Sequence, residues 1–147
     1  DYQFIINFKP DRWPLGDPYR LDGDNEPSYS LLENRTFVTL ADEDAGPTKA
    51  WIVTNRNDPK VDPIYKAVYG KRPKEELYDL KKDPDQMDNL ANNPKHAQTV
   101  KKLRQRLMKY LRETNDPRLI DDGKFFETPP MAGVVKGQRT IEQAISD

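Results

Sequence analysis

The distribution of apolar residues is the feature that most constrains the fold of this chain. The hydrophobic residues form five short clusters separated by polar, proline-containing connections, at residues 2–8, 29–40, 50–53, 64–69 and 97–111. Only 35% of the chain is hydrophobic, whereas roughly 45 to 50% is usual in globular domains. A self-sufficient core is therefore not expected. We expect a part of a larger body, or a domain that completes its core against a partner.

Two segments have the pattern of β-strands. Residues 2–8, YQFIINF, are rich in aromatic and β-branched side chains, which predicts a strand buried on both faces at Phe4, Ile5 and Ile6. Residues 76–80 alternate and predict a second strand, paired antiparallel with the first. The chain opens directly before a strand, without an initiator methionine or a signal peptide, so we expect an excised fragment.

Three short helices are predicted between these strands. Pro27 stands where a helix would begin, and apolar residues at helical spacing follow it, so we predict a helix over residues 28–40. Shorter helices are predicted over residues 49–55 and 63–69. The second of these is expected to end at Gly70 in the left-handed cap conformation.

Residues 76–91, ELYDLKKDPDQMDNLA, combine a strand, a turn signal and a helix-cap signal. Asp83 is a good N-cap, Pro84 fits the first helical position and Gln86 fits a capping box, which predicts a short helix ending near Leu90. The stretch has no histidine, cysteine or serine for covalent chemistry. We interpret it as a structural connection, in which a strand is followed by a turn that leads to the long helix.

The main helix is predicted over residues 94–113. An Asn-Pro pair at 93–94 supplies its start, and it should end near Thr114, because the residue before Pro117 disfavours helix. One face carries an apolar stripe made of Ala97, Val100, Leu103, Leu107, Tyr110 and Leu111. The predicted fold is therefore α+β, with a small antiparallel sheet packed by this helix and a tail at 131–147.

Charge is segregated along the chain although the net charge is only −1. The helix predicted over 94–113 carries one acid, Glu113, against seven basic residues, namely Lys95, Lys101, Lys102, Arg104, Arg106, Lys109 and Arg112. This face could bind a polyanion, or it could be a solvated face that complements the helix dipole and the acidic remainder of the fold. No aromatic residues interleave with the bases, which disfavours a nucleic-acid site. No apolar run approaches the roughly 20 residues of a membrane span.

Catalytic and metal-binding patterns are lacking in the sequence. The chain has no cysteine, which excludes a disulfide framework, a thiolate nucleophile and a cysteine-bound zinc site. His96 is the single histidine and has no partners at the spacing of a triad or a metal site. Carboxylates at 42–44 and at 22, 24 and 26 do not follow the spacing of a calcium loop. We therefore expect no catalytic residue and no metal ligand.

A binding site is predicted in the proline-rich loop from residue 9 to 20. The candidate residues are Lys9, Arg12, Trp13 and Arg20, on a segment whose flexibility is limited by its prolines. Cationic side chains beside an aromatic ring are suited to binding a sulfated or phosphorylated sugar. In the alternative interpretation, Trp13 packs under the loop and the arginines pair with nearby acids, namely Asp11, Asp17 and Asp22.

The stretch at 76–91 resembles a segment near the C-terminus of the type I sulfatases, with the pattern E-L-Y-D-L, two residues, D-P, four residues, N-L-A. The flanking segments GKRPKEELYDL, LRETNDPRLIDDGKF and EPSYSLLENRT look most like the sulfamidase (heparan N-sulfatase) branch and its bacterial relatives. The resemblance spans most of residues 2 to about 130. It does not cover the tail at 131–147.

This resemblance implies that residues 1–147 are a single C-terminal subdomain docked on an N-terminal catalytic domain, where it closes one wall of the substrate cleft. The remaining strands of the sheet would lie upstream of Asp1. In the family, the catalytic domain holds calcium and a formylglycine made from a C-x-P-S-R type motif, which this chain lacks. The parent would hydrolyse sulfate esters or sulfamates, and this chain alone would be inactive.

The resemblance also implies partners and a location. The expected partners are the chain's own catalytic domain and a sulfated saccharide such as heparan sulfate, with Lys9, Arg12, Trp13 and Arg20 as candidate contacts. A periplasmic, secreted or lysosomal location is expected. Two alternatives stay open: an independent polyanion (glycosaminoglycan) binding module using the basic helix 94–113, and a degenerate relative with a scaffolding role.

Overall fold

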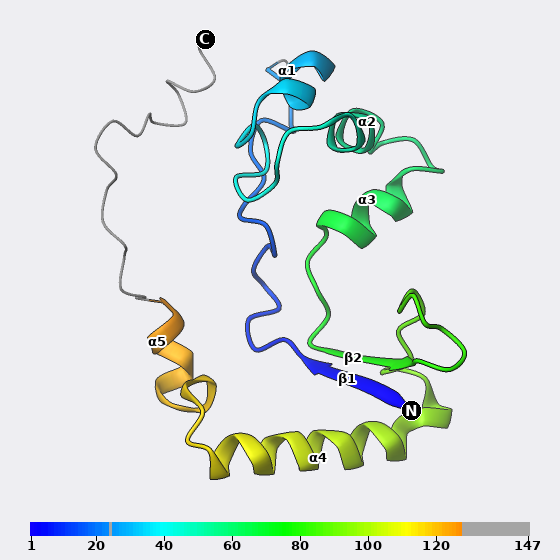
Figure 1. The fold of residues 1–147 in the computed structure, drawn as a ribbon, viewed down its shortest axis with the longest axis vertical. Helices are drawn as coiled ribbons and strands as arrows, with labels where there is room; N and C mark the ends of the chain where they lie inside the picture. The colour runs from blue at the N-terminus through cyan, green and yellow to red at the C-terminus, as the bar shows by residue number, and fades with distance from the viewer. Residues whose placement is uncertain (24, 128–147) are drawn as a thin grey trace. The chain divides into compact units, whose positions relative to one another are not determined.

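The computed structural model describes residues 1–23 and 25–127 (Figure 1). These residues fall into two compact units, one made of residues 1–9 and 73–127 and the other of residues 10–72. Helices and a small antiparallel sheet together give the α+β fold that the sequence predicts. The predicted tail at 131–147 lies outside the described residues, and a single subdomain over 1–147 stays a prediction.

The first unit is built on a two-stranded antiparallel sheet of β1 (Tyr2–Ile6) and β2 (Glu75–Asp79). Its register pairs Tyr2 with Asp79 and Ile6 with Glu75, which confirms the predicted pairing. The predicted burial of β1 on both faces is wrong for this unit. The strand is only half-buried from its second residue onward, because within the unit β2 is its only neighbour in the sheet.

The long helix forms as predicted and lies alongside the sheet (Figure 1). A 3-10 turn, η1 (Pro94–His96), leads directly into α4 (Ala97–Glu113), and Asn93 Oδ1 accepts a hydrogen bond from the Lys95 N–H at 3.0 Å. The helix ends at Thr114, as predicted. Three short elements complete the described part of the unit: η2 (Pro117–Leu119), η3 (Asp121–Gly123) and α5 (Lys124–Glu127).

The helix predicted from Asp83 to Leu90 does not form. The Asp83 carboxylate accepts hydrogen bonds from the backbone N–H groups of Asp88 at 2.8 Å and Met87 at 3.0 Å, and Gln86 takes a left-handed φ of 57°. These bonds hold the pKa of Asp83 below its usual value. Asp83 therefore closes a loop instead of capping a helix, because its side chain reaches residues beyond the first turn.

The second unit contains three short helices, α1 (Tyr29–Asn34), α2 (Pro47–Thr54) and α3 (Asp62–Tyr69). Helices near 49–55 and 63–69 are therefore confirmed, with slightly earlier starts. They surround a core made of Leu32, Val38, Leu40, Ala50, Ile52, Val53, Val61 and Tyr69. Within the described ranges, no helix combines the length and the apolar character that crossing a bilayer requires.

The first of these helices is shorter than predicted. Arg35 is extended, and Phe37 and Thr39 have φ values of 72° and 69°, which a right-handed helix does not allow. Val38 and Leu40 are nevertheless fully buried. The apolar residues at helical spacing beyond α1 are therefore buried, but the segment that carries them is irregular and not helical.

Gly70 ends α3, but not in the predicted left-handed conformation. Its φ is −66° and its ψ is 157°, so any residue could adopt its backbone angles. A Cβ at this position would lie 2.4 Å from the carbonyl oxygen of Lys66. Close approach of the backbone, not φ, therefore requires glycine here.

Two buried cations hold the irregular segments of the second unit. Lys49 Nζ donates to the carbonyl oxygen of Glu43 at 2.9 Å, and burial lowers the pKa of Lys49. Arg56 donates to the carbonyl oxygens of Leu21 at 2.6 Å and Val53 at 3.0 Å, and it also pairs with the Glu26 carboxylate. The carbonyls of Glu43 and Leu21 lie outside regular secondary structure, and that of Val53 lies in the last turn of α2, so these bonds supply partners for backbone acceptors.

Candidate functional site

The outer edge of β2 is covered by the segment that follows it. Asn89 Oδ1 accepts from the Leu77 N–H at 2.9 Å, and Asn89 Nδ2 donates to the Glu75 carbonyl at 3.2 Å. The Leu90 N–H then donates to the Leu77 carbonyl at 2.8 Å. A side-chain amide and one backbone N–H thus take the place of a third strand on this side.

The outer edge of β1 is open in the described part of the chain. Hydrogen bonds from Asn7 N–H to the Lys74 carbonyl and from Leu80 N–H to the Asp1 carbonyl show that odd-numbered residues of β1 face β2. In an antiparallel ladder the alternate residues face outward. The backbone groups of Tyr2, Phe4 and Ile6 therefore point away from β2, and among the described residues no hydrogen bond reaches them.

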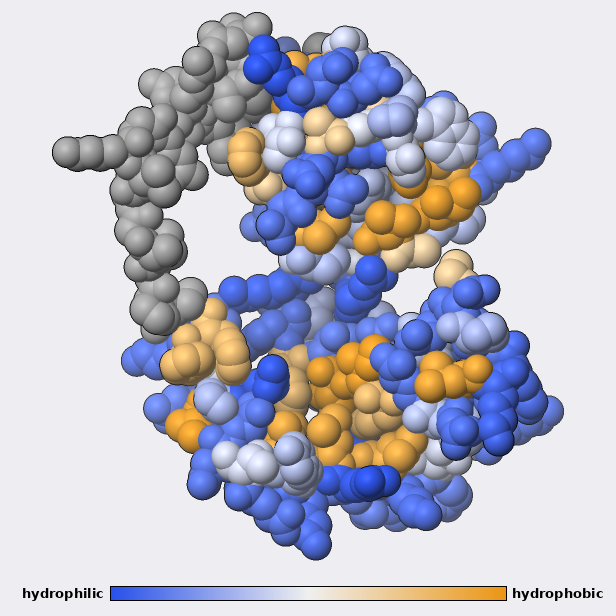
Figure 2. Space-filling model, in the orientation of Figure 1, coloured by the Kyte–Doolittle hydropathy of each residue, from blue (hydrophilic) through white to orange (hydrophobic). Residues whose placement is uncertain are grey.

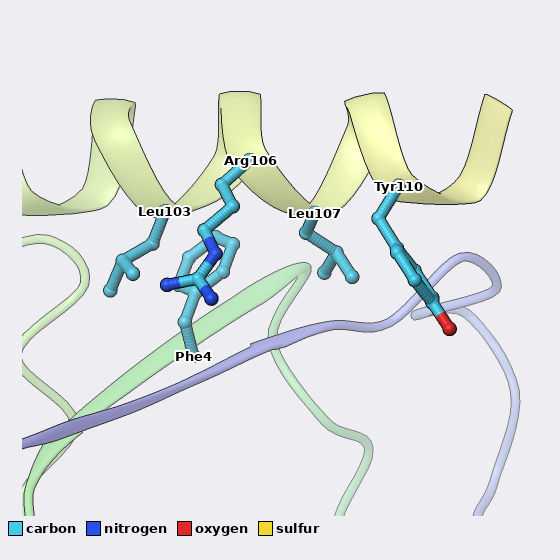
Figure 3. A pocket seen from close by; sticks show the side chains of 5 residues that line it. All are labelled: Phe4, Leu103, Arg106, Leu107 and Tyr110. Carbon is cyan, nitrogen blue, oxygen red and sulfur yellow. The ribbon is translucent and has the colours of Figure 1, made fainter. Parts of the chain in front are cut away.

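An apolar groove lies between β1 and α4 (Figure 3). It has a volume of about 300 Å³ and is lined by Phe4, Leu103, Arg106, Leu107 and Tyr110. In Figure 3 the side chains of the four α4 residues point toward the strand, and the Phe4 ring points from the strand toward the helix, among them. Figure 2 shows apolar residues gathered on the face of this unit. Tyr110 is 63% exposed, so the helix carries more apolar surface than two strands cover.

The basic surface of α4 is partly neutralised within the unit. The Arg104 guanidinium pairs with the Glu75 carboxylate through two nitrogens, and this bond holds the pKa of Glu75 below its usual value. Lys109 lies 3.6 Å from the Glu113 carboxylate. Two of the cations that a polyanion site would use are therefore already paired.

The four predicted binding residues divide between the two units. Lys9 belongs to the first unit, where its Nζ lies 2.6 Å from the Asp122 carboxylate. Arg12, Trp13 and Arg20 belong to the second unit. Trp13 is half-buried, and the Lys71 ammonium lies 5.1 Å from the centroid of its ring. Sequence reasoning missed Lys71, because its approach to Trp13 joins segments that are far apart in the sequence. The binding site itself stays a prediction.

The remaining candidates carry no catalytic arrangement among the described residues. His96 contacts the Tyr2 ring edge-on, with the two ring centroids 5.8 Å apart. Within residues 1–23 and 25–127, no group of three or more histidine, cysteine or acidic side chains could hold a metal ion. Glu43, from the acidic cluster at 42–44, instead accepts a 3.5 Å hydrogen bond from the Tyr69 hydroxyl, and burial raises the pKa of Tyr69 to about 12.

Sequence comparison identifies relatives of the chain. Human N-sulphoglucosamine sulphohydrolase is 33% identical over 102 residues, which cover 68% of this chain and 17% of that protein. The ulvan-active sulfatase of Formosa agariphila is 42% identical over 45 residues, which cover 31% of this chain and 8% of that protein. This chain is related to the sulfatases. The resemblance to a sulfatase C-terminal piece, seen in ELYDLKKDPDQMDNLA, is thus confirmed.

The relationship covers part of each sulfatase. The chain spans less than a fifth of the length of these two relatives. No family model matches the chain, and no solved structure matches it.

Proposed function

We propose that this chain is a non-catalytic C-terminal subdomain of a sulfatase, which packs on a catalytic domain and forms part of its substrate cleft. Two observations support the proposal: the outer edge of β1 is open, and an apolar groove lies between β1 and α4. Unpaired strand edges and open apolar grooves are usually covered in soluble proteins. In the proposal, the rest of the parent sulfatase, with the expected further strands and the catalytic domain, would cover both.

In this proposal the sulfatase chemistry belongs to the catalytic domain. The chain has no cysteine and no C-x-P-S-R type motif from which a formylglycine could be made. The described residues offer no cluster of side chains for a metal ion. Calcium and formylglycine are therefore assigned to the catalytic domain, and no step of the reaction is assigned to residues of this chain.

The proposed substrate is a sulfated saccharide. The names of the two relatives refer to N-sulphoglucosamine and to ulvan, and the longer match supports a sulfated glucosamine of the heparan sulfate type. Hydrolysis of its sulfate ester or sulfamate would take place in a periplasmic, secreted or lysosomal compartment. Arg12, Trp13 and Arg20 are the proposed contacts from the second unit, and Lys9 from the first.

Sulfate release is the experiment that tests this function. The full-length protein, purified with calcium, is incubated with N-sulfated glucosamine, 6-O-sulfated glucosamine and an unsulfated control. We expect sulfate release from at least one sulfated sugar, and none from the 147-residue chain alone. Release by the isolated chain would refute its non-catalytic role, and a folded, calcium-loaded full-length protein that releases none would refute the sulfatase assignment.

A further inference from the structure

Trp13 and Lys71 form a contact that joins the two ends of the second unit's sequence. Trp13 lies in the proline-rich loop, between Arg12 and Pro14, and Lys71 follows α3. The Lys71 ammonium lies 5.1 Å from the centroid of the indole ring. That distance is within the range of a cation–π interaction, with the positive charge over the aromatic ring.

The residues on either side of Lys71 are fixed by α3. Gly70 lies so close to the Lys66 carbonyl that a side chain does not fit. Arg72 Nη1 donates to the Ala67 carbonyl at 2.6 Å, and Nη2 donates to the Val68 carbonyl at 3.3 Å. Both bonds cap the C-terminal end of the helix. The backbone that carries Lys71 is therefore anchored on both sides, so binding a ligand there would not have to order the backbone.

The charge of Lys71 is available to a ligand. Lys71 is exposed, and no carboxylate of the described residues forms an ion pair with it. Trp13 is half-buried and keeps part of its surface accessible. An exposed ammonium beside a partly exposed indole combines a donor for an anion with a flat apolar surface.

We propose that Trp13 and Lys71 together bind one sulfated sugar residue. The sulfate oxygens would accept hydrogen bonds from the Lys71 ammonium, and the apolar face of the sugar ring would lie against the accessible part of the indole that Lys71 leaves uncovered. This inference rests on the proposed function, because it assigns two residues to the contact with its substrate. Lys71 thereby distinguishes sulfated from unsulfated sugars, whereas Trp13 contacts both.

The test measures the binding of a heparin-derived tetrasaccharide, and of the same tetrasaccharide after desulfation, to the full-length protein by calorimetry. Lys71→Gln should weaken binding of the sulfated form by about 5- to 20-fold, because it removes a charge-assisted hydrogen bond. Binding of the desulfated form should change by less than about 2-fold. Lys71→Arg, which keeps the charge, should stay within about 3-fold of the parent, and Trp13→Leu should weaken both forms.

The matched control is Lys60→Gln, which removes an equal charge from another exposed position of the same unit. If Lys71→Gln weakens the sulfated form no more than Lys60→Gln does, the inference is wrong while the proposed function stands. If the parent protein neither binds the sulfated tetrasaccharide nor releases sulfate, the proposed function itself fails. Circular dichroism of each variant separates lost binding from lost structure.

Discussion

At the scale of single residues, Asn89 explains why an ordered segment without reactive side chains follows β2. Its side chain bonds the Leu77 N–H, the Glu75 carbonyl and, at 2.9 Å, the Ala91 N–H. It therefore satisfies one edge of the sheet and fixes the turn that leads to α4. Asn89, in the stretch ELYDLKKDPDQMDNLA, therefore has a structural role, because it pairs with the backbone of β2.

Replacing this asparagine should destabilise the first unit. Asn89→Ala leaves a strand N–H and a strand carbonyl without partners, and we expect a loss of about 1 to 3 kcal/mol in the free energy of unfolding. Urea denaturation of the full chain measures it. Asn92→Ala is the matched control, because Asn92 is exposed and its substitution should cost under about 0.5 kcal/mol. Equal losses for the two variants would contradict the assigned role.

At the scale of elements, the ion pair between Glu75 and Arg104 links β2 to α4. The pairing is bidentate, and it lowers the pKa of Glu75 chiefly through the hydrogen bond from Arg104. Arg104 is 46% exposed, so solvent weakens the interaction. The pair orients the helix on the sheet more than it stabilises the unit.

The stabilisation from this pair should depend on pH. The folded-state pKa of Glu75 lies below the unfolded value of about 4.3. The contribution is therefore complete above that pH, and it is lost as the pH falls through the folded-state pKa. Glu75→Gln should lower stability at pH 7 by at most about 1 kcal/mol. Thermal unfolding at several pH values should show the difference shrinking below about pH 4. A difference that grows on acidification would contradict this account.

The elements also show which sequence signals are reliable in this chain. Asn93 and Asp116 each precede a proline and accept a hydrogen bond from an N–H two residues on. The predicted start of the long helix after Asn93 and its predicted end near Thr114 are both confirmed. Asp83 also precedes a proline, but its carboxylate bonds Met87 and Asp88 and closes a loop. The three local patterns look alike. They differ in which backbone N–H the side chain bonds, two residues on at Asn93 and Asp116 but four and five residues on at Asp83.

The candidate site was only partly visible in the sequence. The proline-rich loop shows Trp13 beside Arg12, but nothing local indicates that Lys71 approaches the indole. The apolar stripe of α4 predicts a packed face, yet the groove next to Phe4 depends on how few strands cover that face. Contacts between distant segments and the width of a sheet are tertiary properties, which periodicity does not encode.

At the scale of the whole molecule, the two edges of the sheet differ. The edge of β2 is closed by Asn89 and Leu90, whereas the outward backbone groups of Tyr2, Phe4 and Ile6 have no partner among the described residues. The chain is a sulfatase-related segment that spans a small fraction of its relatives. The open edge is therefore the place where our proposal predicts that the rest of the parent sulfatase, with the expected further strands and the catalytic domain, packs against this chain.

Amide hydrogen exchange of β1 in the full-length protein tests most directly whether the rest of the protein covers this edge. Gln3 and Ile5 donate within the sheet and serve as internal references. If the edge is covered, Tyr2, Phe4 and Ile6 should be as protected as these two residues. An alternating pattern, with protection at Gln3 and Ile5 and rapid exchange at Tyr2, Phe4 and Ile6, would show an open edge and contradict the account.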